Sequence, residues 1–253
     1  MQNMLTKIAL AALNILDEIF FPCLCAACGA RLENAYQGGL CADCLSKIKK
    51  IEHPLCTICG MPFVSLSGED HICGACLKNP PIFKAARAIF EYDGPIRILI
   101  KKIKFHDDRY ALKTICNLTK RYLEAWPSGL SNPTLLIPVP LHISRLRERG
   151  FNQALDLAKG IFPDLPIYTG LISRNKKTLS QTGLDAQKRI KNVRDAFCAR
   201  NTADPSPEAV TIIDDIFTTG STVNACALAL KKAGTKHIDV FTVARTVKKH
   251  STF

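Results

Sequence analysis

The sequence predicts an α/β fold, in which a mostly parallel β-sheet is flanked by helices and preceded by a small cysteine-rich module. From residue 85 onward, apolar segments of strand length alternate with amphipathic helical segments, which is typical of parallel sheets. Nine of the twelve cysteines lie within the first 76 residues. Because the composition changes near Pro80, we expect a cysteine-rich module over residues 1–82 and an α/β domain over residues 83–253.

Eight of the early cysteines form four C-x-x-C pairs, separated by 11 to 13 residues. The pairs are Cys25/Cys28, Cys41/Cys44, Cys56/Cys59 and Cys73/Cys76. A secreted disulfide framework, redox-active pairs and structural zinc are the competing interpretations. The first needs an export signal, but Asp17 and Glu18 stand where a signal peptide would be cleaved. We therefore predict a cytoplasmic protein with two structural zinc ions, and leave open which pairs share an ion.

The opening segment is predicted to form a helix with one apolar face. Its apolar residues are Leu5, Ile8, Ala12, Ile15, Leu16 and Ile19. This segment is too short and too charged to cross a bilayer, so we expect no membrane span.

The α/β domain is predicted to contain four strands and four helices. The strands are expected over residues 85–92, 134–139, 210–213 and 237–244, and the helices over residues 96–105, 112–126, 143–162 and 223–233. A brief extended segment is expected at Ile167, and Gly234 is expected to end the last helix. In parallel sheets of this kind, ligands bind at the carboxyl ends of the strands.

Residues 210–222, VTIIDDIFTTGST, carry the most informative motif. An apolar strand over 210–213 is followed by Asp214 and Asp215, and then by a turn of small residues over 218–222 before a helix. Free backbone N–H groups and the dipole at a helix N-terminus attract phosphate. Carboxylates repel phosphate, so we expect the two aspartates to face the vicinal hydroxyls of a ribose. The motif therefore predicts a site for a 5-phosphoribosyl group.

Two other interpretations of this motif are weaker. An ordinary turn with an aspartate cap requires neither paired acids nor the T-T-G-S-T run, and a Walker-type loop requires a Gly-Lys-Ser/Thr sequence that is absent here. The motif resembles the PRPP-binding signature of the type I phosphoribosyltransferases. We assign Asp214 and Asp215 as catalytic carboxylates that bind the ribose hydroxyls directly or through magnesium. The residues assigned to the 5-phosphate are Thr218, Thr219, Gly220, Ser221 and Thr222.

A second loop follows the strand expected over 134–139. Residues 145–153 read RLRERGFNQ, and we expect Arg149, or the loop 138–142, to face the pyrophosphate of PRPP. The alternative is an amphipathic helix with solvated arginines. Gly150 and Phe151 favour the loop, because they suit neither a helix interior nor a solvated face.

The R-G-F-N-Q-A sequence, the PRPP motif and the C-x-x-C module together resemble the ComF family, which includes ComFC-like and GntX-like proteins. Further matching positions are Tyr92, Asp93, Gly94, Lys101, Arg174, Thr178, Gln181, Thr182, Leu184, Arg189, Asn192 and Phe197. The resemblance implies a zinc module on a type I phosphoribosyltransferase-like domain, and it adds Lys104 to the PRPP-binding residues. It also implies a role in natural transformation, with single-stranded DNA and proteins of the competence machinery as partners.

The net charge of +12 lies entirely in the α/β domain, because residues 1–84 carry seven basic and seven acidic side chains. Such an excess fits both the anion PRPP and nucleic acid. Two functions stay open. One is an enzyme, a glycosyltransferase that transfers phosphoribosyl to an acceptor the sequence does not identify, in competence or in nucleotide or other small-molecule metabolism. The other is a DNA-handling protein that keeps PRPP as a regulatory ligand.

Overall fold

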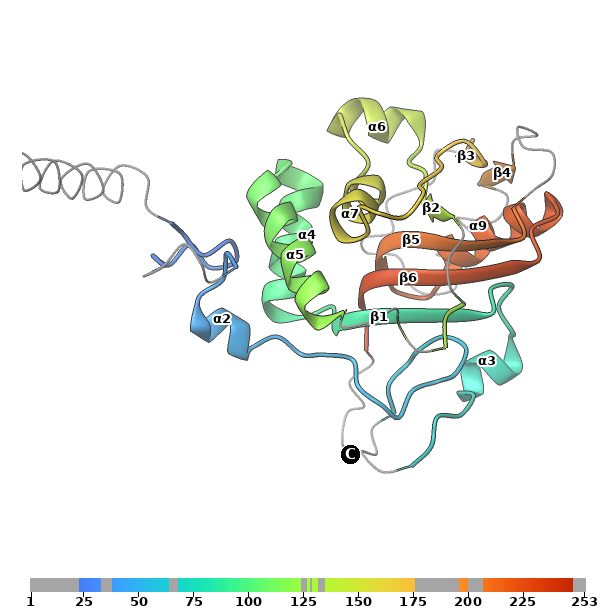
Figure 1. Ribbon diagram of the computed structural model, residues 1–253, viewed down its shortest axis with the longest axis horizontal. Helices are drawn as coiled ribbons and strands as arrows, with labels where there is room; N and C mark the ends of the chain where they lie inside the picture. Colours follow the sequence, from blue (N-terminus) through green and yellow to red (C-terminus); the bar gives the residue numbers. More distant parts are fainter. Residues whose placement is uncertain are drawn as a thin grey trace, which may run out of the picture.

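The computed structural model describes residues 23–32, 38–63, 68–123, 127, 129–131, 135–175, 196–199 and 207–247, so the predicted N-terminal helix lies outside the described residues. Its centre is a parallel four-stranded sheet with the order β1-β6-β5-β2 (Figure 1). The strands are β1 (Ala85–Glu91), β2 (Leu136–Pro138), β5 (Ala209–Phe217) and β6 (His237–Arg245). Together with the helices on both faces, this sheet confirms the predicted fold class.

Helices cover both faces of the sheet. One face packs against α4 (Gly94–His106), α5 (Arg109–Tyr122) and α7 (Gln153–Ile161), and the other packs against α9 (Ser221–Lys232). Neighbouring strand residues divide between the two cores, because successive side chains of a strand point to opposite faces. Ile213 belongs to the first core, with Leu99 and Leu157, whereas Ile212 belongs to the second, with Leu230.

Strand β5 is longer than the sequence predicted. The prediction ended the strand at Ile213 and placed both aspartates after it, which is wrong. Pairing with β6 continues to the last residues of both strands, Phe217 and Arg245, so the ladder carries β5 past the acids. Asp214 and Asp215 are therefore consecutive strand residues whose side chains point to opposite faces of the sheet.

The single helix predicted over residues 143–162 is also wrong. The structure has two helices there, α6 (Ile143–Arg149) and α7. Gly150 ends α6 in the left-handed conformation, with φ of 78°, which glycine adopts without steric cost. Asn152 then caps α7 by accepting a hydrogen bond from the Ala154 N–H at 3.0 Å. The R-G-F-N-Q sequence is thus the junction between two helices.

A small second sheet was not predicted. Strands β3 (Ile172–Arg174) and β4 (Phe197–Ala199) pair antiparallel and pack against α9. The extended segment predicted at Ile167 is a single parallel bridge to Leu136 beside β2.

The cysteine-rich module wraps around the edge of the sheet formed by β1 (Figure 1). Its first half, which contains α2 (Ala42–Ser46), packs on the core shared with α4 and α5. Its second half contains α3 (Gly74–Lys78). Between them, the N–H groups of Glu91 and Ile51 donate to Lys49 and Ile89 at 2.9 Å each, which extends pairing beyond β1. The open edge of the sheet is thereby covered.

The predicted division at residue 82 falls between α3 and β1 and stays a prediction. Among the described residues, each helix is too short or too polar to cross a membrane.

Candidate functional site

The two aspartates of β5 lie at the carboxyl edge of the sheet in different surroundings. The Asp215 carboxylate is buried and forms an ion pair with the ammonium group of Lys104, which projects from α4. The backbone N–H of Asp215 donates a hydrogen bond to Oδ1 of Asp214 at 2.9 Å, which holds the Asp214 carboxylate beside the Asp215 backbone. Of the two carboxylates, Asp215 is the one neutralised by a lysine.

Asp214 is the aspartate whose charge is least favourable. Burial raises its pKa well above the usual value of 3.8, and the neighbouring charge of Asp215 raises it further, while Lys104 acts in the opposite direction. A group that donates hydrogen bonds to this carboxylate, or a cation, would favour its ionised form. Ribose hydroxyls and magnesium have this chemistry.

The turn that follows β5 brings Gly220 and two side-chain hydroxyls to the start of α9. Gly220 is left-handed, with φ of 76°, and a Cβ atom there would lie 2.6 Å from Cζ of Phe217. The Ser221 N–H contacts Oγ1 of Thr219 at 3.4 Å, and the two hydroxyls of these residues are hydrogen-bonded to each other. Because α9 begins at Ser221, the positive end of its dipole lies at this turn.

Arginines from two other segments face the aspartates. Arg149, the last residue of α6, donates to Oε1 of Gln153 at 3.1 Å. Burial and the charge of Arg145 lower the pKa of Arg149, and Asp215 opposes this shift. Arg174 behaves alike: burial and Arg145 lower its pKa, and Cys226 and Asp214 oppose the shift. Arg149 and Arg174 therefore share the electrostatic field of the two carboxylates, and Arg145 adds a third positive charge beside these two arginines, which is an arrangement that favours a polyanion.

Three residues near this site, Arg145, Arg174 and Tyr92, had no role in the site predicted from the sequence. Tyr92 is half-buried, and burial raises the pKa of its hydroxyl, while the nearby charges of Lys104 and Asp215 act in opposite directions. Arg174 stood in a matching sequence pattern, but only the fold brings it to Asp214. The matching positions from Thr178 to Asn192 lie outside the described residues.

The loop from Pro138 to His142 was expected to face pyrophosphate. In the structure it leads from β2 into α6, where Nδ1 of His142 accepts a hydrogen bond from the Ser144 N–H at 3.2 Å and caps the helix. The side chain of Asn152 donates to the Val139 carbonyl at 3.1 Å, which ties the loop to the R-G-F-N-Q junction. The loop and Arg149 are therefore held together.

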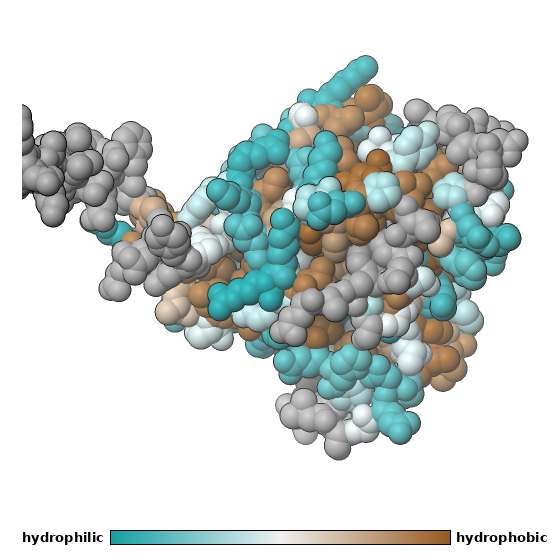
Figure 2. All heavy atoms as spheres, in the orientation of Figure 1, coloured by the Kyte–Doolittle hydropathy of each residue, from teal (hydrophilic) through white to brown (hydrophobic). Residues whose placement is uncertain are grey.

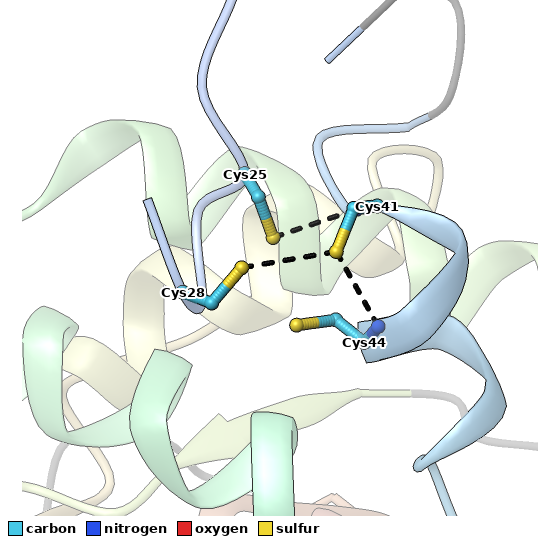
Figure 3. A group of neighbouring side chains, drawn as sticks. All are labelled: Cys25, Cys28, Cys41 and Cys44. Atoms are coloured by element: carbon cyan, nitrogen blue, oxygen red, sulfur yellow. Dashed lines mark hydrogen bonds between the residues drawn. The ribbon is translucent and has the colours of Figure 1, made fainter. Parts of the chain in front are cut away.

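Four sulfurs of the first half of the cysteine-rich module point toward one another (Figure 3). They belong to Cys25, Cys28, Cys41 and Cys44 and lie within 4.8 Å of one another. The sulfurs of Cys28 and Cys41 are 3.7 Å apart. A tetrahedral zinc ion with Zn–S bonds of about 2.3 Å would place its sulfurs roughly 3.8 Å apart, so this group fits zinc.

The second half repeats the arrangement with Cys56, Cys59, Cys73 and Cys76, again within 4.8 Å of one another. The sulfurs of Cys59 and Cys73 are 3.8 Å apart. Burial raises the pKa of Cys56, but backbone N–H donors, including those of Cys73 and Cys59, outweigh this effect and lower it to about 7. The thiolate is the form that binds a metal.

The structure answers the open question of pairing: consecutive C-x-x-C pairs share each site. Basic side chains of the α/β domain hold both sites through backbone carbonyls. Lys102 donates to the Ala26 carbonyl at 2.6 Å, Arg87 donates to the Thr57 carbonyl at 3.1 Å, and Arg245 donates to the Cys59 carbonyl.

Comparison with known proteins agrees with this arrangement. Residues 16–77 match the double zinc ribbon domain family, which supports structural zinc at both four-cysteine groups. Two solved structures overlap partially. A purine phosphoribosyltransferase from Pyrococcus horikoshii has a TM-score of 0.31 and 16% identity, covering 57% of this chain and 93% of that one. A hypoxanthine phosphoribosyltransferase from Staphylococcus aureus has a TM-score of 0.27 and 20% identity, covering 56% and 70%.

Overlaps this limited leave the family assignment to the sequence relatives. Competence protein F of Haemophilus influenzae is 34% identical over 233 residues, which cover 89% of this chain and 98% of that protein. DNA utilization protein YhgH of Escherichia coli O157:H7 is 31% identical over 232 residues, with the same coverage. Competence protein ComFC of Bacillus subtilis is 27% identical over 217 residues, covering 82% of this chain and 84% of that protein. At this identity over nearly the whole length of both chains, the protein belongs to the ComF family.

Proposed function

We propose that this protein binds PRPP with magnesium at the carboxyl end of β5 and acts in the uptake and processing of transforming DNA. The observation that carries the first half is the position of Asp214 and Asp215 directly before the turn 218–222, with Lys104 paired to Asp215 and with Arg149 and Arg174 in the electrostatic field of the two carboxylates.

Each part of PRPP has a matching group in this site. The turn 218–222 supplies backbone N–H groups and hydroxyls for the 5-phosphate. The aspartates accept hydrogen bonds from the ribose hydroxyls, and Arg149 with Arg145 and Arg174 neutralises the pyrophosphate. Magnesium, when bound with PRPP, would supply further positive charge to the leaving pyrophosphate.

Transfer of phosphoribosyl would develop positive charge at the anomeric carbon as pyrophosphate leaves. The carboxylate of Asp214 stabilises such charge in a partly dry site, where electrostatic interactions are stronger than in water. The ion pair with Lys104 keeps the Asp215 side chain in a fixed position. The reaction class is glycosyl transfer, and the sequence does not identify the acceptor.

The DNA role is supported by the names of the relatives, which are competence and DNA utilization proteins. A second observation favours it. Exposed basic side chains project from α4, α5 and α6, and hydrophilic side chains lie over α4 and α5 on the face in Figure 2. They include Lys101, Arg109, Lys113, Lys120, Arg121 and Arg147. Such a surface suits the phosphates of single-stranded DNA.

The alternative is a phosphoribosyltransferase of nucleotide or other small-molecule metabolism without a DNA role. The two functions differ in their salt dependence, because each phosphate contact with a single strand releases a counterion. We expect the parent protein to bind an oligothymidine with an affinity that falls as salt is added. The slope of the logarithm of the binding constant against the logarithm of the salt concentration should decrease in magnitude by up to roughly two when Lys101, Lys113 and Arg147 are changed together to Gln. A parent protein that shows no salt-dependent binding favours the alternative.

The PRPP half is tested by changing Asp214 and Asp215 together to Asn. We expect this variant to lose PRPP binding, because the amides neither attract magnesium nor accept hydrogen bonds as strongly from the diol. The matched control is Asp156→Asn on α7, whose carboxylate pairs with Arg109. If the double variant binds PRPP as tightly as the control, the motif is a structural turn. Release of pyrophosphate with candidate acceptors then separates an enzyme from a regulatory PRPP site.

A further inference from the structure

A series of direct contacts joins the second cysteine group to the phosphate-binding turn. It begins at Arg245, the last residue of β6, whose side chain is buried with 1% of its surface exposed. Its guanidinium donates a hydrogen bond to the carbonyl of Cys59. This hydrogen bond ties a buried guanidinium of the α/β domain to the backbone of the second cysteine group.

The next contact is with Phe217, the residue that Arg245 faces in the ladder between β5 and β6. The guanidinium carbon lies 5.0 Å from the centre of the Phe217 ring, within the range of a cation–π interaction. The same ring lies against Gly220, where it leaves no room for a side chain. Arg245 therefore fixes the ring that supports the turn.

The residue after Arg245 reinforces this connection. The Thr246 N–H donates to the Phe217 carbonyl at 2.9 Å, and the Thr246 hydroxyl donates to the Thr218 carbonyl at 3.3 Å. Residues 245 and 246 thus contact Phe217 and Thr218, the residues that lead into the turn, through both side chains and backbone.

We propose that Arg245 is a positioning residue through which the second zinc site holds the phosphate-binding turn in its binding conformation. This inference rests on the proposed PRPP site and adds a way to regulate it. When zinc leaves the second site, the Cys56–Cys59 segment loses its fixed geometry and Arg245 loses its partner, so the turn 218–222 loosens. Because linkage is reciprocal, a phosphorylated ligand bound at the turn also slows zinc loss from the second site.

Arg87 provides a matched control. It lies on β1, is buried with 8% of its surface exposed and donates to Thr57 in the same C-x-x-C segment. In the sheet, β6 with Arg245 lies between β1, which carries Arg87, and β5, which leads into the turn. Arg87 is therefore one strand farther from the turn than Arg245. Loss of either arginine removes a cation from the second cysteine group, but only loss of Arg245 removes the support of Phe217.

The test compares Arg245→Met, Arg245→Lys and Arg87→Met in the full zinc-loaded chain. Without any ligand, we expect hydrogen exchange of the amides of residues 218–222 to rise at least about fivefold in Arg245→Met and to stay within twofold of the parent in Arg87→Met. Arg245→Lys, which keeps the charge, should restore part of the protection. PRPP with magnesium should bind roughly tenfold more weakly to Arg245→Met, with no such loss in Arg87→Met.

A fourth variant covers the case in which Arg245→Met fails to fold. Phe217→Leu keeps apolar volume and leaves the cysteine group untouched, so we expect two zinc ions per chain together with faster exchange at residues 218–222. Equal exchange in Arg245→Met and Arg87→Met, or parent-like exchange in Phe217→Leu, overturns the coupling. Failure of the parent to bind PRPP overturns the proposed function alone, because the exchange comparison needs no ligand.

Discussion

The ammonium group of Lys104, on α4, forms an ion pair with the buried carboxylate of Asp215, on β5. This pair joins a helix that packs beside the first cysteine group to the strand that carries both aspartates of the candidate site. It also gives the two adjacent acids different electrostatic surroundings, since the charge of Asp215 has a close partner and that of Asp214 is disfavoured by burial.

Lys104→Met should leave the Asp215 carboxylate buried without its cation. We expect the free energy of unfolding to fall by about 1–3 kcal/mol at neutral pH, the usual cost of removing one partner of a buried polar pair. Lys101→Met is the matched control, because Lys101 lies on the same helix with an exposed side chain. Urea denaturation of both variants measures the difference. Equal stability of the two would show that the ion pair contributes nothing.

Asp214→Asn should make the stability of the protein less dependent on pH. Burial raises the pKa of Asp214 in the folded state above its unfolded value of 3.8. The folded protein therefore loses stability as the pH rises from the unfolded pKa of this carboxyl group through its folded pKa. The amide does not titrate, so the melting temperature of the variant should fall less between pH 5 and pH 8 than that of the parent, measured without magnesium. Asp215→Asn should instead destabilise the protein, because it removes the partner of Lys104.

Gly220→Ala should be more damaging than Gly150→Ala. Both glycines are left-handed, with φ of 76° and 78°, so each substitution incurs backbone strain of about 1–2 kcal/mol. A Cβ atom at residue 150 meets open space, whereas one at residue 220 collides with the Phe217 ring. The additional loss of stability at residue 220, together with weaker PRPP binding, measures the crowding under the turn. Equal effects at both positions would contradict the role given to Phe217.

Elemental analysis should find two zinc ions per chain in freshly purified protein. The grouping of the cysteines is tested by pairs of substitutions to Ser. Changing Cys25 and Cys44 removes ligands from one group and should leave one zinc ion, whereas changing Cys25 and Cys56 should leave none. One remaining ion in the second variant would indicate a different sharing of the C-x-x-C pairs.

Local patterns in the sequence identified the elements that depend on local chemistry. Alternating apolar segments predicted the parallel sheet, and the spacing of the C-x-x-C pairs predicted two metal sites. The ends of elements were predicted less well. Strand β5 extends to Phe217 only because β6 continues beside it, and that pairing depends on residues about thirty positions away. The break of the long helix at Gly150 had a local signal in R-G-F-N-Q, which the prediction assigned to ligand binding alone.

The contacts that define the candidate site could not be predicted for a similar reason. Lys104 reaches Asp215 from more than a hundred residues away, and Arg245 reaches Cys59 over 186 residues. Periodicity and composition place a residue on an element, but they do not determine which elements become neighbours. Arg174 was a matching position without an assigned role until the fold placed it near Asp214.

Calorimetric titration of the parent protein with PRPP in magnesium tests whether the site at the carboxyl end of β5 binds PRPP. We expect saturable binding to one site per chain, with affinity that falls when magnesium is omitted and that is competed by ribose 5-phosphate and by pyrophosphate, since each occupies part of the site. The absence of binding heat and of competition at millimolar PRPP would show that this site does not bind PRPP, and the aspartates, the turn and the arginines would then require another ligand.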